Sequence, residues 1–179
     1  MVKGKVFFSG IITLCIIFIV ILTAGCNDND TASLITNPGF EDGSTGWTLG
    51  TNAVISSSNA HSGSGCLSLS PEDGDASTAE QEFTVDSGTS YNFTFWRRRL
   101  EDSGATYGSL RTIIYFYDSE SSQLSSSGGI GEVPTTYSLS TGGGSLPAGT
   151  SSVKIVFVNY VTGLSDDTIV IDDLAFTVE

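Results

Sequence analysis

Residues 91–99 read Tyr-Asn-Phe-Thr-Phe-Trp-Arg-Arg-Arg, and their alternation is the clearest fold signal in the chain. Successive side chains of a β-strand point to opposite faces, so the aromatic residues at positions 91, 93 and 95 share one face. Trp96 and Arg98 share the other face with smaller polar residues. The pattern predicts a strand that buries Tyr91, Phe93 and Phe95 and turns Trp96 and Arg98 toward solvent.

A second stretch further along the chain also alternates, although both of its faces carry large side chains. We assign Ile114 and Phe116 to the core face, which leaves Arg111, Tyr115 and Tyr117 on the solvent face. A shift of one residue in strand pairing would exchange the two faces, because the side-chain period of a strand is two.

Eight stretches of the sequence have the composition of β-strands, since they are rich in β-branched and aromatic residues. They are Ala53–Ser57, Leu67–Ser70, Glu80–Val85, Tyr91–Leu100, Leu110–Asp118, Thr135–Ser140, Val153–Tyr160 and Thr168–Val178. Turn residues such as Asp86-Ser87-Gly88 and Gly142-Gly143-Gly144 separate them. No helical period is sustained, so residues 34–179 are predicted to form one all-β domain, a two-sheet antiparallel β-sandwich.

Four short motifs are distributed along this domain: Asn37-Pro38-Gly39-Phe40-Glu41, Gly46-Trp47, His61-Ser62-Gly63-Ser64-Gly65 and Ile171-Asp172-Asp173-Leu174. In this order and spacing, the chain resembles the jelly-roll carbohydrate-binding modules of families 4, 9 and 22, within the wider galactose-binding-like fold. The resemblance extends roughly from Leu34 to Val178. It implies a jelly roll that binds a poly- or oligosaccharide without catalysis. Trp47 follows Gly46 in the entry turn and is expected to pack in the core.

The same resemblance implies a structural calcium ion at one edge of the sandwich. In the modules that this chain resembles, the acid of the first motif and an aspartate of the last strand bind the metal. Here those residues are Glu41 and Asp172, with backbone carbonyls near Asn37 and Gly63, and Asp173 replaces Asp172 if the register differs. The alternative is that the two carboxylates accept hydrogen bonds from backbone N–H groups of adjoining loops.

Saccharide recognition requires flat apolar faces and planar polar side chains. Trp96, Tyr115 and Tyr117 offer the first, and Arg98 and Arg111 the second. Four arginines fall within fifteen positions, which predicts a positive patch on adjacent strands and makes an acidic polysaccharide one candidate ligand. The alternative is that the arginines pair with nearby acids, which are Glu101, Asp102, Asp118 and Glu120.

The first 25 residues have the pattern of an export signal, with two lysines followed by an apolar run and small residues. The apolar core from Ile11 to Leu22 has 12 residues, fewer than the ~20 of a membrane-spanning helix. Residues 22–26, Leu-Thr-Ala-Gly-Cys, resemble the bacterial lipoprotein signal, which implies a lipid on Cys26. The alternatives are an ordinary cleaved signal and an uncleaved anchor.

The expected product is an exported protein, attached to the bacterial cell envelope by lipid alone, with residues 26–33 as the lipidated cysteine and a short tether. Asn27 after the lipidated cysteine favours the outer membrane if the host has two membranes. Cys66 would then be the remaining thiol, so no disulfide can form within the mature chain, and its surroundings predict a small buried residue.

Charge and missing motifs exclude several functions. Without Lys3 and Lys5, the chain has 5 basic and 20 acidic residues, a net formal charge of −15, which argues against a nucleic-acid partner. The sequence has one histidine, His61, and no familiar nucleophile, dinucleotide or zinc motif, so we expect no enzymatic activity. The alternatives to saccharide binding are an adhesion or envelope-structural domain with a protein partner, and a small hydrolase.

Overall fold

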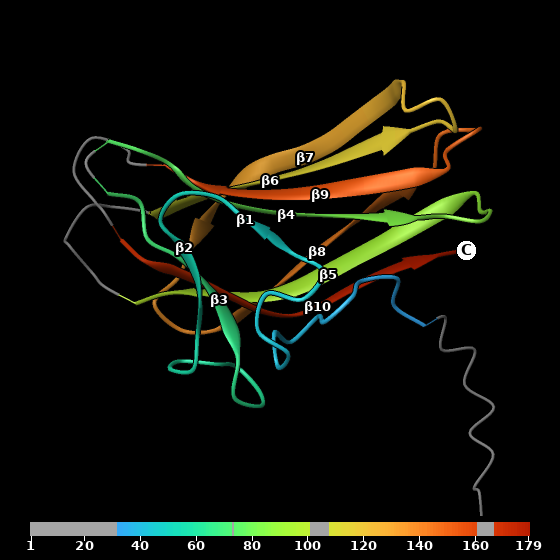
Figure 1. Cartoon of the computed structure of the whole chain (residues 1–179). Coiled ribbons are helices and arrows are strands. Elements are labelled where there is room, and N and C mark those ends of the chain that lie inside the picture. The colour runs from blue at the N-terminus through green and yellow to red at the C-terminus, as the bar shows by residue number, and fades with distance from the viewer. Residues whose placement is uncertain (1–31, 73, 101–107, 161–166) are drawn as a thin grey trace, which may run out of the picture. The chain divides into compact units, whose positions relative to one another are not determined.

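The computed structural model describes residues 32–72, 74–100, 108–160 and 167–179. These residues form ten strands in two antiparallel sheets, one with the order β1-β4-β9-β6-β7 and the other with the order β2-β3-β10-β5-β8. The strands are β1 Thr48–Leu49, β2 Ala53–Ser56, β3 Cys66–Leu69, β4 Ser77–Thr84, β5 Ser90–Arg99, β6 Gly108–Tyr117, β7 Gln123–Val133, β8 Ser138–Ser145, β9 Ser152–Asn159 and β10 Ile169–Val178. Figure 1 shows the sheets as two layers, and the all-β sandwich expected from the sequence is confirmed.

The predicted export segment and Cys26 lie outside the described residues. Among the residues that the structure describes, none belongs to a helix long and apolar enough to cross a membrane.

Two predicted connections are strands in the structure. Residues 123–133 form β7, which the sequence did not predict, and Gly142-Gly143-Gly144, interpreted as a turn, lies inside β8. Both strands are rich in serine and glycine and therefore have low intrinsic β-propensity. Their conformation depends on pairing with neighbours, because β7 pairs along β6 and β8 pairs along β5.

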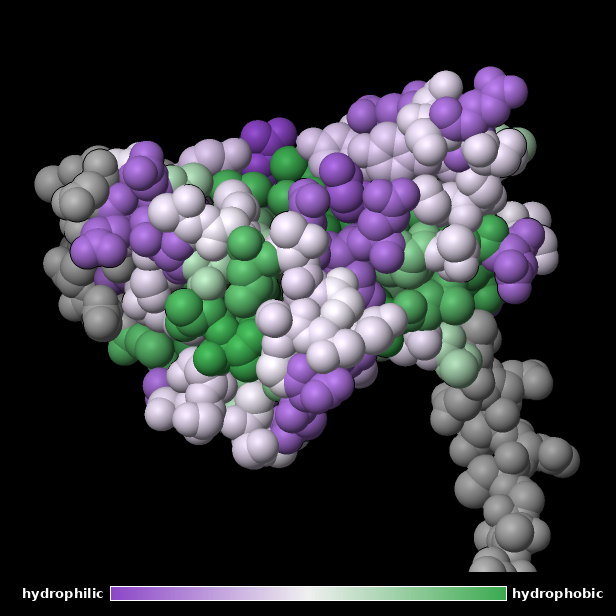
Figure 2. Space-filling model, viewed as in Figure 1, coloured by the Kyte–Doolittle hydropathy of each residue, from purple (hydrophilic) through white to green (hydrophobic). Residues whose placement is uncertain are grey.

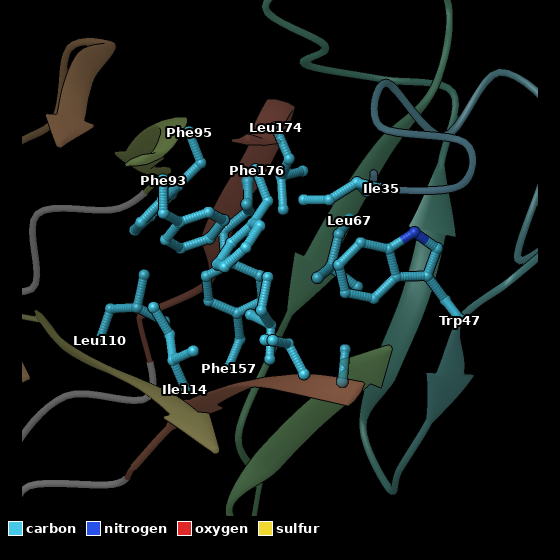
Figure 3. Packing of buried hydrophobic residues seen from close by; sticks show 14 of the residues in the cluster. Ile35, Trp47, Leu67, Phe93, Phe95, Leu110, Ile114, Phe157, Leu174 and Phe176 are labelled. Atoms are coloured by element: carbon cyan, nitrogen blue, oxygen red, sulfur yellow. The ribbon is translucent and has the colours of Figure 1, made fainter. Parts of the chain in front are cut away.

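The core between the sheets consists largely of aromatic rings. Figure 3 shows Phe93, Phe157 and Phe176 meeting between the layers, with Trp47 at one side of them. The Trp47 ring lies 6.2 Å from that of Phe157 and 5.2 Å from that of Phe40, and the residue is 7% exposed. Its predicted core position is confirmed.

The predicted faces of the two long strands are also confirmed. Tyr91, Phe93 and Phe95 of β5 are at most 5% exposed, and Ile114 and Phe116 of β6 are 4% and 2% exposed. At the start of β3, the Cys66 side chain is fully buried as predicted, and its Sγ donates to the Ser58 carbonyl at 3.2 Å. Burial raises the pKa of the Cys66 thiol to about 11.

Candidate binding surfaces

The five predicted ligand-binding residues do not share one face. Trp96 and Arg98 lie on β5, whereas Arg111, Tyr115 and Tyr117 lie on β6, and these strands belong to different sheets. The outward positions of β5 and β6 therefore face opposite sides of the sandwich. The predicted patch on adjacent strands was wrong, because these consecutive strands join different sheets. Alternation within a strand does not show which sheet the strand joins.

The outer side of β6 brings two tyrosines together beside a cation. The Tyr115 and Tyr117 rings lie 6.3 Å apart at an interplanar angle of 33°. Lys154, opposite Tyr115 on the neighbouring strand β9, places its Nζ atom 5.7 Å and 5.9 Å from the two ring centroids. Cation–π attraction at this distance stabilises the arrangement and keeps an ammonium group next to the rings.

Arg111 lies on the same outer side, in register with Val158 of β9 and Ile130 of β7. Its side chain is exposed. A hollow of about 530 Å³ runs along β6 and β7 beside it, lined partly by Arg111, Ile113 and Gly128. We call the surface formed by Arg111, Tyr115, Tyr117 and Lys154 the β6 face. The sequence analysis missed Lys154, because only strand pairing shows that β9 lies next to β6.

Trp96 and Arg98, on the opposite outer face, are engaged within the protein. The His61 ring stacks on Trp96 with centroids 4.1 Å apart and an interplanar angle of 15°. Arg98 donates to Asn59 Oδ1 at 2.6 Å and lies 4.9 Å from the centroid of the Tyr137 ring. One face of the Trp96 indole is thus covered by His61. A ligand role for Trp96 and Arg98 stays a prediction.

The three regions predicted to meet at a calcium site do lie together. Glu41 accepts hydrogen bonds from Ser64 N and Gly65 N, both at 2.9 Å to its Oε1 atom. The backbone of Gly63, at φ 57°, passes so close to this carboxylate that no Cβ would fit. Hydrogen bonds from the backbone of Gly65 and from Ser64 lower the pKa of Glu41.

Asp172 has the same kind of partners, although it is buried. Its Oδ2 atom accepts from His61 N at 2.8 Å and Ser62 N at 3.1 Å, and its Oδ1 atom accepts from Asp173 N at 2.7 Å. Burial raises the pKa of this carboxyl, while the three backbone donors act in the opposite direction.

Regular alternation would point the neighbouring Asp172 and Asp173 to opposite faces of β10, but the strand is irregular here. Asp173 has a positive φ of 47°, and the pairing of β10 with β5 shifts register between Asp172 and Ala175. A bulge of this kind redirects a side chain. Asp173 therefore reaches the same loop as Asp172, with its Oδ2 atom 2.6 Å from His61 Nδ1 and its Oδ1 atom 2.6 Å from Ser62 Oγ.

As arranged here, these residues do not form the oxygen-only shell that calcium requires. Backbone N–H groups point at both predicted carboxylates, and the Asn37 carbonyl already accepts from Phe40 N and from Trp47 Nε1. Among the described residues, no group of three or more His, Cys, Asp and Glu side chains could hold a metal ion. Calcium binding through Glu41, Asp172, Gly63 and Asn37 stays a prediction.

The three consecutive arginines of β5 occupy three different environments. Arg98 lies on the outer face beside Asn59, as described above. Arg99 points inward and pairs with Asp167 at 3.0 Å, with side-chain exposures of 9% and 2%. Arg97 also points between the sheets, where it is half-buried near the Phe95 ring. Of the acids predicted to pair with arginines, Glu101 and Asp102 lie outside the described residues.

Comparisons with known proteins agree with this architecture. A model of the carbohydrate-binding domain family matches residues 32–112. A solved structure, family 16 carbohydrate-binding module 2, superposes with a TM-score of 0.62 at 17% identity, over 80% of this chain and 99% of that one. The chain therefore has the jelly-roll fold of these modules.

Two further structures share this jelly roll. TmCBM61, solved in complex with β-1,4-galactotriose, has a TM-score of 0.58 at 20% identity over 82% of this chain and 99% of that one. The enzymatically active domain of bacteriophage CBA120 tailspike protein 4 has a TM-score of 0.67 at 19% identity. The match covers 82% of this chain but only 21% of that domain. No curated protein matches the sequence.

Proposed function

We propose that this chain is a non-catalytic carbohydrate-binding domain that holds a saccharide on the β6 face. The observation that carries the proposal is the tyrosine pair of β6, with a lysine against both rings, on a jelly roll of the carbohydrate-binding type. The match to the carbohydrate-binding family model supports the ligand class.

The chemistry of the β6 face suits a sugar. The apolar faces of Tyr115 and Tyr117 can pack against the C–H groups of a pyranose ring, which buries apolar area at little entropic cost. The Lys154 ammonium carries three hydrogen-bond donors and the Arg111 guanidinium five, and both can donate to sugar hydroxyls. The hollow along β6 and β7 gives this ligand space next to Arg111.

The proposal also places the domain at the bacterial cell envelope. Its support is the sequence pattern of residues 1–26, an apolar run followed by Leu-Thr-Ala-Gly-Cys, which resembles a lipoprotein signal. A lipid on Cys26 would hold the domain at the membrane surface, where a binding domain meets external polysaccharides.

The alternative, a protein partner on a broad apolar surface, receives less support. Figure 2 shows separate apolar areas on the face in view, with neutral and hydrophilic residues between them. Large exposed apolar patches are typical of protein-binding sites. The face in view therefore shows no single broad apolar patch of this kind.

Affinity electrophoresis against a panel of polysaccharides tests the proposal. The panel contains a β-1,4-galactan, a xylan and a uronate-containing polysaccharide, and the chain is used both in full length in detergent and as residues 27–179. We expect at least one polysaccharide to retard the wild type, and Tyr115→Ala to reduce this retardation clearly. Retardation that is unchanged in Tyr115→Ala, or none with any polysaccharide, would overturn the proposal.

A further inference from the structure

The sandwich has a groove along one side that is lined by none of the four residues of the β6 face. It borders the hollow beside Arg111, because both are lined by Thr112, Ser127, Gly128, Gly129 and Ile130. At the groove the two sheets end with β7 and β8 as their edge strands. A hollow of about 500 Å³ lies between these strands, within the range of small-molecule sites. Phe93, Phe95 and Arg97 of β5 line it from one sheet, and Leu110 and Ile114 of β6 line it from the other.

The groove exists because the inward positions of both edge strands carry almost no side chain. On β7 these positions are Ser127, Gly129 and Gly131, which pair with the inward Ile114, Thr112 and Leu110 of β6. On β8 they are Ser140 and Gly142, which pair with the inward Phe95 and Phe93 of β5. A Cβ atom at Gly129 would meet nothing within 4 Å, and one at Gly142 would meet only the Phe93 carbonyl oxygen at 4.0 Å.

Arg97 extends across this groove toward β7. A Cβ atom at Gly131 would lie 2.8 Å from Arg97 Nη1 and 3.1 Å from Nη2, so the guanidinium rests against the glycine backbone. The described residues supply no ion pair to Arg97, and its Nε atom is buried without a hydrogen-bond partner among them. Ser140 Oγ, which also lines the groove, is buried and unpartnered in the same part of the chain.

A half-buried guanidinium that has no ion pair among the described residues is unusual in a protein with 20 acidic residues. Desolvation disfavours a buried charge unless an opposite charge or hydrogen bonds compensate. Arg99, two positions along the strand, has Asp167 as such a partner. The residues that line the groove include no carboxylate, so Arg97 is their single formal charge. Burial lowers its pKa, as expected for a cation without a partner.

The walls of the groove are apolar, because Phe93, Phe95, Leu110 and Ile114 line it. Ile130 and Leu139 also border it, but their side chains point to the outer faces, since they pair with the outward Arg111 and Trp96. Apolar walls, hydroxyl groups and one fork-shaped cation together suit a ring with C–H faces and an oxyanion substituent.

We propose that the groove between β7 and β8 is a second binding site, which takes a sugar residue bearing an anionic group, with that oxyanion bound by Arg97 and Ser140. The oxyanion is a carboxylate or a sulfate, since a guanidinium binds both in two-point geometry. The anion requirement rests on the unpaired Arg97. The sugar part of the assignment rests on the proposed function.

The test measures binding of three small probes to the full chain in detergent by calorimetry. The probes are glucuronate, glucose 6-sulfate and inorganic sulfate, with glucose as the neutral reference. Gly129→Leu fills the open space of the groove, and Arg97→Gln removes the charge. Ser126→Leu is the matched control, because it places the same side chain on the outward side of β7, opposite Tyr115.

We expect glucuronate, glucose 6-sulfate or both to bind more tightly than glucose and inorganic sulfate. Arg97→Gln should weaken that binding about tenfold or more, as expected for loss of a charge-assisted hydrogen bond. Gly129→Leu should weaken it by a similar factor, because the leucine side chain occupies the space of the ligand. Ser126→Leu and Tyr115→Ala should leave it within about twofold, and thermal melting confirms that every variant is folded.

The outcomes separate this site from the β6 face. No preference for either anionic sugar, or a preference that survives both groove variants, overturns the groove site and leaves the β6 face standing. Inorganic sulfate bound as tightly as both sugars overturns the sugar assignment. If no polysaccharide of the panel binds, but glucuronate binds and this binding is lost in Arg97→Gln, the β6 face is overturned as a binding site and the groove is supported.

Discussion

His61 and Asp173, 112 residues apart in sequence, lie with His61 Nδ1 2.6 Å from Asp173 Oδ2. The contact orients the imidazole ring that covers Trp96. Because Asp172 holds the backbone of the same histidine, two consecutive carboxylates of β10 attach the loop at residue 61 to the outer side of the sheet.

Replacing His61 should therefore uncover Trp96. We expect His61→Ala to increase the acrylamide quenching of tryptophan fluorescence, because Trp47 is buried and contributes little to the change. Asp173→Asn should give a smaller increase, since the ring stays but loses its charged partner. Ser62→Ala serves as the control for local loosening. Unchanged quenching in His61→Ala would contradict the stacked arrangement.

Asp172→Asn should destabilise the domain by about 1–3 kcal/mol, because the new amide NH₂ group would oppose buried backbone N–H donors. Asp173→Asn, at a position with a more exposed side chain, is the matched comparison and should cost less. Urea unfolding in calcium and in chelator measures both variants.

The same experiment tests calcium. If Asp172→Asn lowers the free energy of unfolding equally in calcium and in chelator, hydrogen bonding to the loop accounts for the stabilising effect of this carboxylate. A loss that appears only with calcium present would contradict that account and support the metal site implied by the family resemblance.

Glu41 should make the stability of the domain depend on pH in the acidic range. Its folded-state pKa is lowered below the ordinary value of 4.5 by hydrogen bonds from Gly65 and Ser64. Its contribution is therefore present above the ordinary carboxyl pKa and is lost as the pH falls through the depressed folded value. We expect the melting-temperature difference between the wild type and Glu41→Gln to shrink from pH 6 toward about pH 3.

Comparison with Glu41→Gln is needed because Asp172 acts in the opposite direction. Burial raises the pKa of Asp172, so protonation of this group at low pH favours the folded state. The absolute pH profile mixes both effects, whereas the difference between the two proteins isolates Glu41. A difference that stays constant from pH 6 to pH 3 would contradict the lowered pKa.

Each tyrosine of the β6 face should contribute separately to saccharide affinity. We expect Tyr115→Ala and Tyr117→Ala each to lower the affinity for the polysaccharide identified by electrophoresis by about 2- to 10-fold. Replacement of either tyrosine by Phe should retain most of the affinity. Lys154→Met removes the cation next to both rings, and its affinity should lie between those of the Ala and the Phe variants. Equal losses in the Phe and Ala variants would assign the effect to the hydroxyl groups instead of the ring faces.

Cys66 offers a probe of unfolding. Its side chain is fully buried and its pKa is raised to about 11, so little thiolate is present at pH 8. We expect a thiol reagent to label residues 27–179 only as fast as the domain opens, and the rate to rise in Asp172→Asn. Rapid labelling of the folded wild type would place Cys66 nearer the surface than the structure does.

The strength of local patterns decided how much of the fold could be predicted. The faces of β5 and β6 followed from alternation, and Trp47 was correctly placed in the core. β7 was missed because the run Ser125–Gly129 has neither β-branched nor aromatic residues, so only its pairing with β6 makes it a strand.

The binding surfaces were harder to predict because they depend on which strands become neighbours. Lys154 joins the tyrosines only through the pairing of β9 with β6. Alternation along β5 separates Arg98 from Arg97 and Arg99, but their partners, such as Asn59 for Arg98 and Asp167 for Arg99, are distant in sequence. The bulge after Asp172 likewise depends on a register shift that simple alternation does not contain.

The small side chains of β7 and β8 also affect how molecules of this protein meet one another. Both strands are sheet edges, and on their outer sides the described residues provide no further strand to pair with their backbone. Such edges can template strand addition from another molecule, which natural proteins commonly prevent with charge or proline. In this protein, the formal net charge of −13 opposes such strand addition, because like-charged molecules repel one another. Acidification, by neutralising carboxylates, would remove this repulsion and favour edge-to-edge assembly of the domains.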